Sequence, residues 1–129
     1  MKYVVMIHSN PASWVHPMFL HQNEILEPEV REARLKEFAE LMTEIHQSGE
    51  LVGSAALDAP STSKILRMSD DKLTVTDGPF ADAKEHLAGF FIIDVDSEER
   101  AFEIASRMPD AKNSPVEIRP FADLSHMER

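Results

Sequence analysis

The chain has 129 residues and a formal net charge of −10, from 13 Lys and Arg against 23 Asp and Glu. Its length predicts one domain, and its acidity disfavours nucleic-acid phosphates and anionic membrane surfaces, so we expect neither as a partner. Cysteine is absent, which excludes disulfides and fits a cytoplasmic protein. The first apolar run, Tyr3 to Ile7, is too short for a signal peptide or a membrane span.

The first half of the chain predicts one strand, one loop and one long helix. Residues 3–8 are β-branched and apolar on both faces, which is typical of a central strand. Residues 11–26 have weak periodicity, and we expect an ordered loop there. A helix over 28–48 follows, because Pro28 suits a first helical position and Gly49 suits a C-terminal stop. Its predicted apolar face comprises Leu35, Phe38, Leu41, Met42 and Ile45.

Shorter elements fill the second half. We expect strands over 51–57, 64–68, 72–76, 89–95 and 115–121, and a second helix over 97–108. The strands 64–68 and 72–76 read as a hairpin, because the intervening Ser69-Asp70-Asp71 is polar turn sequence. Residues predicted to point inward from the second helix are Ala101, Phe102, Ile104, Ala105 and Met108.

This order predicts an α+β fold, a ferredoxin-like βαββαβ unit with an inserted β-hairpin. We assign residues 1–121 to the domain and 122–129 to a C-terminal tail. Both helices would cover one face of an antiparallel sheet and leave the other face open and apolar. Because such a face needs a partner, we predict a homodimer.

The most distinctive segment is Asp77-Gly78-Pro79-Phe80, whose first three residues predict a tight turn. Phe80 is expected to plug that turn into the core. Lys84 and Glu85 follow just before a strand, where their charges are expected to face a cleft.

With this segment, the chain resembles the YCII-related family, in particular its Asp-Gly-Pro-Phe (DGPF) subgroup. The resemblance covers about residues 2–121 and extends to Ser48-Gly49-Glu50-Leu51, Lys84-Glu85, Gly89-Phe90 and Val116-Glu117-Ile118-Arg119-Pro120. It implies a dimeric α+β barrel, in which two copies pair sheet to sheet. Most of the family has no assigned reaction.

A minority of that family is similar to dehydrochlorinases and lyases that use an Asp at the end of the first strand and a His on the first helix. This chain departs from that pattern, because its first strand ends His8-Ser9-Asn10 and its first helix has no histidine before His46. The His–Asp pair is therefore not carried over.

Three residues are candidates for catalysis. His8, at the end of the first strand, is either a general base or a half-buried histidine bonded to backbone. Asp77 either caps a turn or also faces a ligand. Arg119 either binds a substrate carboxylate in a bidentate manner or forms a structural ion pair.

Four further residues are candidates for ligand binding. Lys84 and Glu85 either border the site or pair on the surface. Trp14 and His16 belong to the loop, where Trp14 and Phe19 either roof a pocket or anchor the loop. His16, His21 and Glu24 are too weak a pattern for a metal site, and we expect none. Only 4 glycines and no phosphate loop argue against a nucleotide cofactor.

Two functions from different classes stay open. The first is a homodimeric small-molecule-binding or regulatory domain, because the His–Asp pair is missing and some relatives are encoded beside extracytoplasmic-function sigma factors. The second is a small enzyme with lyase-like or hydrolase-like acid–base chemistry in a cleft of the sheet and helices. The residues alone do not decide whether the protein is an enzyme.

Overall fold

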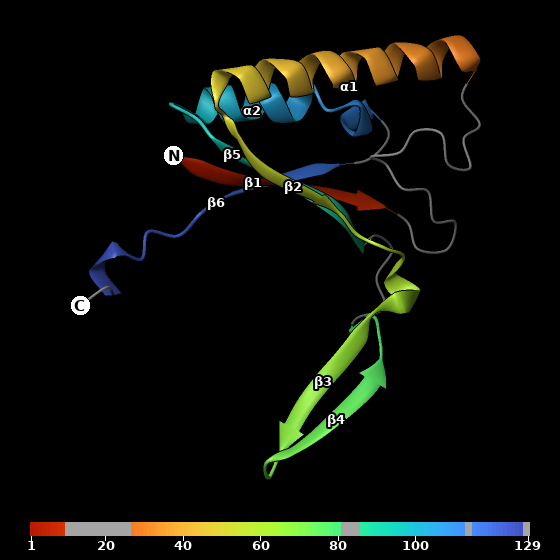
Figure 1. Cartoon of the computed structure of the whole chain (residues 1–129), viewed down its shortest axis with the longest axis vertical. Helices are drawn as coiled ribbons and strands as arrows, with labels where there is room; N and C mark the ends of the chain where they lie inside the picture. Colours follow the sequence, from red (N-terminus) through yellow and green to blue (C-terminus); the bar gives the residue numbers. More distant parts are fainter. Residues whose placement is uncertain (10–26, 81–85, 113–114, 128–129) are drawn as a thin grey trace.

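The computed structural model is an α+β fold and describes residues 1–9, 27–80, 86–112 and 115–127. Two helices lie on one face of a four-stranded antiparallel sheet with the order β2-β5-β1-β6 (Figure 1). The elements are β1 (Lys2–Ser9), α1 (Pro28–Ser48), β2 (Leu51–Ala56), β3 (Lys64–Ser69), β4 (Lys72–Asp77), β5 (His86–Asp94), α2 (Glu98–Ser106) and β6 (Val116–Pro120). This order is consistent with a ferredoxin-like fold.

The predicted helices and strands are confirmed, with shifts of up to three residues at their ends, and the loop predicted over 11–26 lies outside the described residues. α1 has Pro28 in its first turn and ends at Gly49, whose φ of 83° is the left-handed conformation that glycine adopts without strain. α2 is capped by Ser97, whose hydroxyl accepts a hydrogen bond from the backbone N–H of Arg100 at 3.1 Å. Local backbone chemistry therefore sets both helix boundaries.

The hydrophobic core lies between the sheet and the helices. Its fully buried members include Val5 and Ile7 of β1, Leu41 and Ile45 of α1, and Phe91 of β5. Alternate residues of a strand point to opposite faces, so Val5 and Ile7 share the helical face. The edge of the Phe38 ring packs on Phe91, with ring centroids 6.1 Å apart.

Two residues of the predicted helix faces lie outside this core. Leu35 is 41% exposed and Phe102 is 51% exposed, so the prediction that they point inward is wrong. Both lie at helical spacing from true core residues, so periodicity alone does not separate them from the buried positions. The remaining predicted residues, Phe38, Leu41, Met42, Ile45, Ala101, Ile104, Ala105 and Met108, are core or pack against it.

The second face of the sheet has no helix over it in the described part of the chain (Figure 1). Residue pairs Val4–Ile92 and Met6–Phe90 lie side by side on β1 and β5, and all four are only half-buried. We call these four residues the open sheet face. Its coverage by a second copy stays a prediction.

β3 and β4 form a two-stranded sheet of their own, which extends away from the body on the side opposite the helices (Figure 1). We call residues 64–77 the arm. Asp70 and Asp71 form its turn with φ values of 50° and 63°. Positive φ at both central residues suits the twist of a hairpin, although Asn and Gly adopt it more readily than Asp.

Candidate functional site

A pocket of about 370 Å³ lies where the sheet meets the base of the arm. It is lined by Leu57, Asp58, Pro60, Thr62, Ser63, His86 and Leu87. Its volume falls within the range of small-ligand sites, and it combines apolar walls with a carboxylate, two hydroxyls and an imidazole. We call it the junction pocket.

The strand pairing explains how histidines reach this end of the sheet. β1 ends as β5 begins, so that His8 lies opposite Leu87 and Ser9 lies opposite His86. The register shifts between Ile7 and His8, because Gly89 pairs with Ile7 and Ala88 is an extra residue on β5. A bulge reverses the alternation of side chains between the two faces of a strand. Because the extra residue is Ala88, the side chains of His86 and Leu87 lie on the faces opposite to those that regular pairing would give them.

The base of the arm forms one wall of the junction pocket. The backbone N–H of Gly78 donates a hydrogen bond to the carbonyl of Ser63 at 2.8 Å. A Cβ added at Gly78 would lie 2.8 Å from the Cβ of Ser63, closer than real side chains approach. Only glycine therefore allows the two ends of the arm to close against each other at the pocket.

The neighbours of Gly78 in the Asp77–Phe80 segment face outward. The Asp77 carboxylate pairs with the Lys64 ammonium across the arm, and 83% of the Asp77 side chain is exposed. Phe80 is 79% exposed, and the guanidinium carbon of Arg67 lies 5.6 Å from its ring centroid. The prediction that Phe80 enters the core is wrong, because the arm carries this segment away from the core.

His8 is held by a carboxylate of the neighbouring strand. Its Nε2 lies 3.2 Å from Oε1 of Glu117, and 23% of its side chain is exposed. The two are brought together because Glu117 lies opposite Met6, two residues before His8 on the same face of β1. A hydrogen bond to a carboxylate fixes the orientation of a histidine ring, as acid–base chemistry requires.

Arg119 lies farther along the same sheet. It pairs with Val4 in the ladder, and four residues of strand, about 13 Å, separate Val4 from His8. Within the described ranges, no carboxylate lies in ion-pair contact with Arg119. The strand register therefore places His8 beside Glu117 and away from Arg119, while Asp77 belongs to the arm. The roles predicted for His8, Asp77 and Arg119 stay predictions.

The four predicted ligand-binding residues, Trp14, His16, Lys84 and Glu85, lie outside the described residues, as do Phe19, His21 and Glu24. Among the described residues, no three His, Asp or Glu side chains gather as a metal ion would require. No helix in that part of the chain is long and apolar enough to cross a membrane.

A cluster of charges joins α1, α2 and β2 on the helical side. Arg100 donates to both Glu50 oxygens at 2.8 Å, to Glu44 at 2.8 Å and to Glu103 at 2.9 Å. Arg107 donates to the same Glu44 oxygen at 2.8 Å. We call these five residues the Arg100 network. Glu50 belongs to the Ser48–Leu51 segment, so the network gives that segment a structural purpose.

Hydrogen bonds in the Arg100 network shift the pKa of Glu44, Glu50, Arg100 and Arg107 toward their charged forms. Hydrogen bonds from Arg107 and Arg100 lower the pKa of Glu44 to about 2. The hydrogen bonds from Arg100 also lower the pKa of Glu50, and Glu50 in turn raises the pKa of Arg100. These shifts favour the charged forms of Glu44, Glu50 and Arg100. The network stabilises the packing of the two helices.

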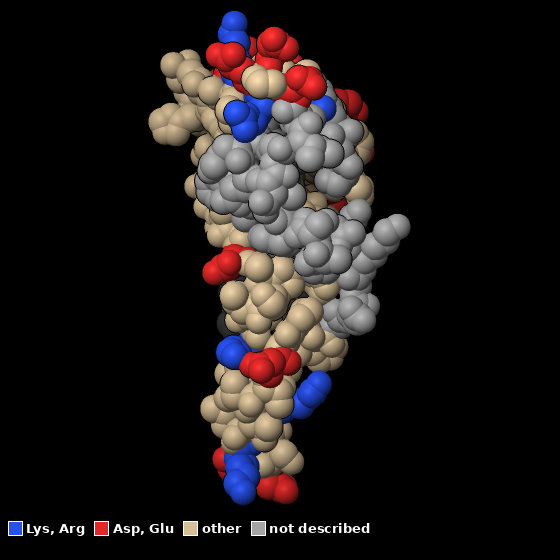
Figure 2. Space-filling view, turned by 90° about the vertical axis from the view of Figure 1, so that its right-hand side faces the viewer, with Lys and Arg blue, Asp and Glu red and all other residues tan. Residues whose placement is uncertain are grey.

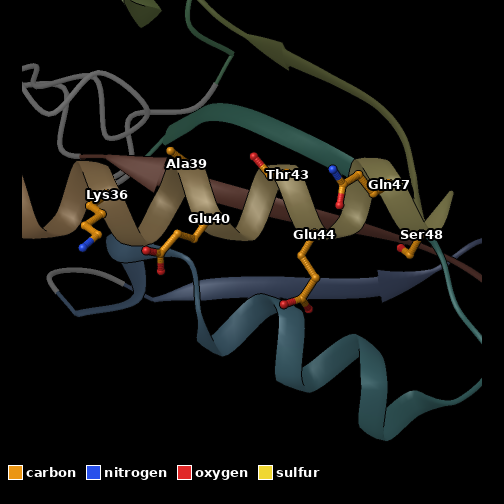
Figure 3. Close-up of a pocket in the computed structure, with 7 residues that line it drawn as sticks. All are labelled: Lys36, Ala39, Glu40, Thr43, Glu44, Gln47 and Ser48. Carbon is orange, nitrogen blue, oxygen red and sulfur yellow. The ribbon is translucent and has the colours of Figure 1, made fainter.

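A larger groove of about 700 Å³ runs along α1 (Figure 3). It is lined by Lys36, Ala39, Glu40, Thr43, Glu44, Gln47 and Ser48. All seven belong to one helix, and Glu44 points toward α2, where it is bound in the Arg100 network. A groove with one wall encloses a ligand poorly. The junction pocket, built from two strand ends and the arm base, is the better candidate.

Three residues of this region, Asp58, His86 and Glu117, were not singled out from the sequence. His86 follows directly on Lys84 and Glu85, but its position depends on the bulge at Ala88, which no local pattern indicates. Glu117 was visible as a polar residue of an alternating strand. Its contact with His8 joins residues 109 positions apart.

The fold and the junction pocket define a class: an α+β domain with a ligand-sized pocket at one end of its sheet. The model of the YCII-related domain family matches residues 1–125, and the chain belongs to this family. The chain is also similar to an uncharacterised protein of Rhizobium meliloti (strain 1021), with 37% identity over 78 residues. The match covers 59% of this chain and 63% of the relative, so it spans less than two thirds of that protein.

Proposed function

We propose that this YCII-related protein is a homodimeric small-molecule-binding domain of the DGPF subgroup, and that its ligand occupies the junction pocket. The observation that carries the proposal is the lining of that pocket. Asp58, Thr62, Ser63 and His86 bring four polar side chains to one hollow whose other walls are apolar. A few placed polar groups in an apolar pocket are typical of small-ligand sites.

The lining also indicates the class of ligand. Asp58 contributes a carboxylate, and the chain as a whole carries a charge of −10, so an anion is disfavoured at this mouth. Leu57, Pro60 and Leu87 favour an apolar body. We expect a neutral or cationic organic molecule with at least one hydrogen-bond donor for Asp58.

Dimerisation rests on the open sheet face. Val4, Met6, Phe90 and Ile92 present a contiguous apolar surface that lies opposite the helices. A two-fold pairing of two such faces would bury both, and it supports the dimeric α+β barrel that the family resemblance implies.

Thermal-shift measurement against a metabolite panel tests this proposal. A ligand at 100 times its Kd stabilises the folded state by about 2.7 kcal/mol, which raises the Tm by several degrees. We expect His86→Ala to abolish the shift given by a hit. The matched control is His46→Ala, an exposed histidine in the last turn of α1. A panel without any hit, or a hit unaffected by His86→Ala, would contradict the proposal.

The second candidate is an enzyme, and the specific observation in its favour is the pair of His8 and Glu117 at 3.2 Å. In this alternative His8 acts as a general base or acid and Glu117 orients its ring. Slow turnover of a panel hit, followed by NMR, would support it if His8→Ala stops the turnover and Glu117→Gln reduces it. A hit that binds the wild type for days without change would count against it.

A further inference from the structure

The arm has one strongly apolar face that nothing in the described chain covers. In its ladder Leu66 lies opposite Val75 and Met68 lies opposite Leu73, so the four side chains form one contiguous patch. Their exposed fractions are 62% for Leu66, 54% for Val75, 64% for Met68 and 55% for Leu73. We call these four residues the apolar arm face. Single exposed apolar residues are ordinary, but a cluster of four on one hairpin marks a contact surface.

Within the described residues, the arm joins no other sheet. Its strands pair only with each other among the described elements, and the arm extends away from the body (Figure 1). Figure 2 shows a largely uncharged surface along the arm between the charged groups at its tip and at its base. An isolated two-stranded hairpin is at best marginally stable in water, so a regular six-pair ladder indicates that something packs on it.

The distribution of charge indicates which binding partner fits the apolar arm face. The arm holds three basic residues and three acidic residues, Lys64, Arg67, Lys72, Asp70, Asp71 and Asp77, and so has no net charge. The whole charge of −10 therefore resides outside the arm. Two copies of this chain repel each other across their bodies, and the arm is the surface over which that repulsion is weakest. A neutral apolar surface also offers nothing to nucleic-acid phosphates or an anionic membrane.

The direction in which the arm extends also favours a second copy of this chain as its partner. The helices cover one side of the four-stranded sheet, and the arm extends past the opposite side, beyond the open sheet face (Figure 1). A second copy seated on the open sheet face would lie alongside the arm. Stable dimers bury about 1,600 Å² in total, and the apolar arm face would add to the area that the open sheet face contributes.

We propose that the arm is a dimer clasp: in a two-fold dimer, each apolar arm face packs on the body of the other copy. This inference rests on the homodimer of the proposed function and deepens it. It also links dimerisation to the ligand site, because Thr62 and Ser63 at the arm base line the junction pocket and Gly78 is bonded to Ser63. The clasp holds that wall of the pocket in place, so the dimer binds a pocket ligand more tightly than a monomer does.

The first test compares two substitutions at neighbouring positions of β4. Val75→Lys places a charge on the apolar arm face, and Thr74→Lys places the same charge on the opposite face of the same strand. Sedimentation equilibrium of the full chain gives the dimer dissociation constant. We expect Val75→Lys to raise it by at least about tenfold and Thr74→Lys to change it by less than about threefold.

The outcomes separate the two proposals. A wild-type chain that stays monomeric at high micromolar concentration overturns the homodimer and the clasp together. A dimer whose constant responds to neither substitution, or equally to both, overturns the clasp and leaves the homodimer and the junction pocket standing. Far-UV circular dichroism of each variant confirms that the body is folded.

A second readout does not depend on affinity. The chain has no cysteine, so Met68→Cys creates a unique attachment point for a photo-crosslinker, and Thr74→Cys is its control on the other face. In a mixture of ¹⁴N-labelled and ¹⁵N-labelled subunits, crosslinked peptides of mixed label come from two different chains. We expect mixed peptides from Met68→Cys in several-fold excess over Thr74→Cys. Crosslinks confined to one chain would overturn the clasp.

Discussion

Replacing Glu50 by Gln is expected to lower the free energy of unfolding by about 2 kcal/mol at pH 7. Glu50 accepts two charge-assisted hydrogen bonds from Arg100 at 2.8 Å, and only 17% of its side chain is exposed. Each such bond contributes about 1.5–3 kcal/mol. Gln keeps one carbonyl acceptor, and Arg100 keeps Glu44 and Glu103 as partners, so about half of the combined contribution is lost.

The effect has a defined pH dependence. The pKa of Glu50 is lowered in the folded state from its ordinary value of 4.5, so the unfolded chain takes up protons first as the pH falls. The contribution of the Glu50 carboxylate is therefore complete well above pH 4.5 and disappears as the pH falls through its lowered folded-state pKa. The difference between wild type and Glu50→Gln should stay constant from pH 8 to about pH 6 and shrink below about pH 4.5.

Urea unfolding followed by circular dichroism, at one protein concentration from pH 3 to pH 8, measures this difference. Glu40→Gln is the matched control, because Glu40 is an exposed residue of α1 outside the Arg100 network, and its change should stay within about 0.5 kcal/mol. A loss at pH 7 below about 0.5 kcal/mol for Glu50→Gln would refute the reasoning. A loss that persists unchanged to pH 3 would assign the effect to packing instead of charge.

Two further predictions concern the arm. Gly78→Ala should speed amide exchange at both ends of the arm, because its Cβ would lie 2.8 Å from the Cβ of Ser63. Gly53→Ala is the control, because its Cβ would meet nothing within 4 Å and should leave exchange in the arm unchanged. Equal exchange rates in the two variants would contradict the close approach of Gly78 and Ser63. Asp70→Asn combined with Asp71→Gly should slow amide exchange within the arm by a few-fold, because Asn and Gly adopt the positive φ values of this turn at lower cost. Faster exchange in that double variant would contradict the assigned turn geometry.

Local patterns were sufficient to predict most of the fold. Pro28 and Gly49 mark the ends of α1 by backbone chemistry, and the alternation of Val116 and Ile118 with polar residues marks β6. These patterns act within a few residues of each other, so they can be read along the chain. Phe80 shows the limit, because an aromatic residue after a turn is buried only if the preceding segment stays near the core.

The candidate site could be predicted from the sequence less completely than the fold. The site was predicted in a cleft of the sheet and helices, whereas the junction pocket lies at the base of the arm and His8 is not among its lining residues. The position of Glu117 beside His8 depends on the register between β1 and β6, and the position of His86 depends on one extra residue at Ala88. A change of one residue in register moves a side chain to the other face, and the bulge at Ala88 makes such a change at the end of a strand whose apolar pattern fixes only its buried part.

Chemical-shift mapping with a ligand found in the thermal-shift panel tests the central claim most directly, because it discriminates between the junction pocket and the groove along α1. With ¹⁵N-labelled protein, the account predicts that the amides of Leu57, Ser63 and His86 shift on saturation. The chemical shifts of the Ala39 and Thr43 amides, in the groove along α1, should not change. Shifts confined to the α1 groove would contradict the assignment of the junction pocket as the ligand site.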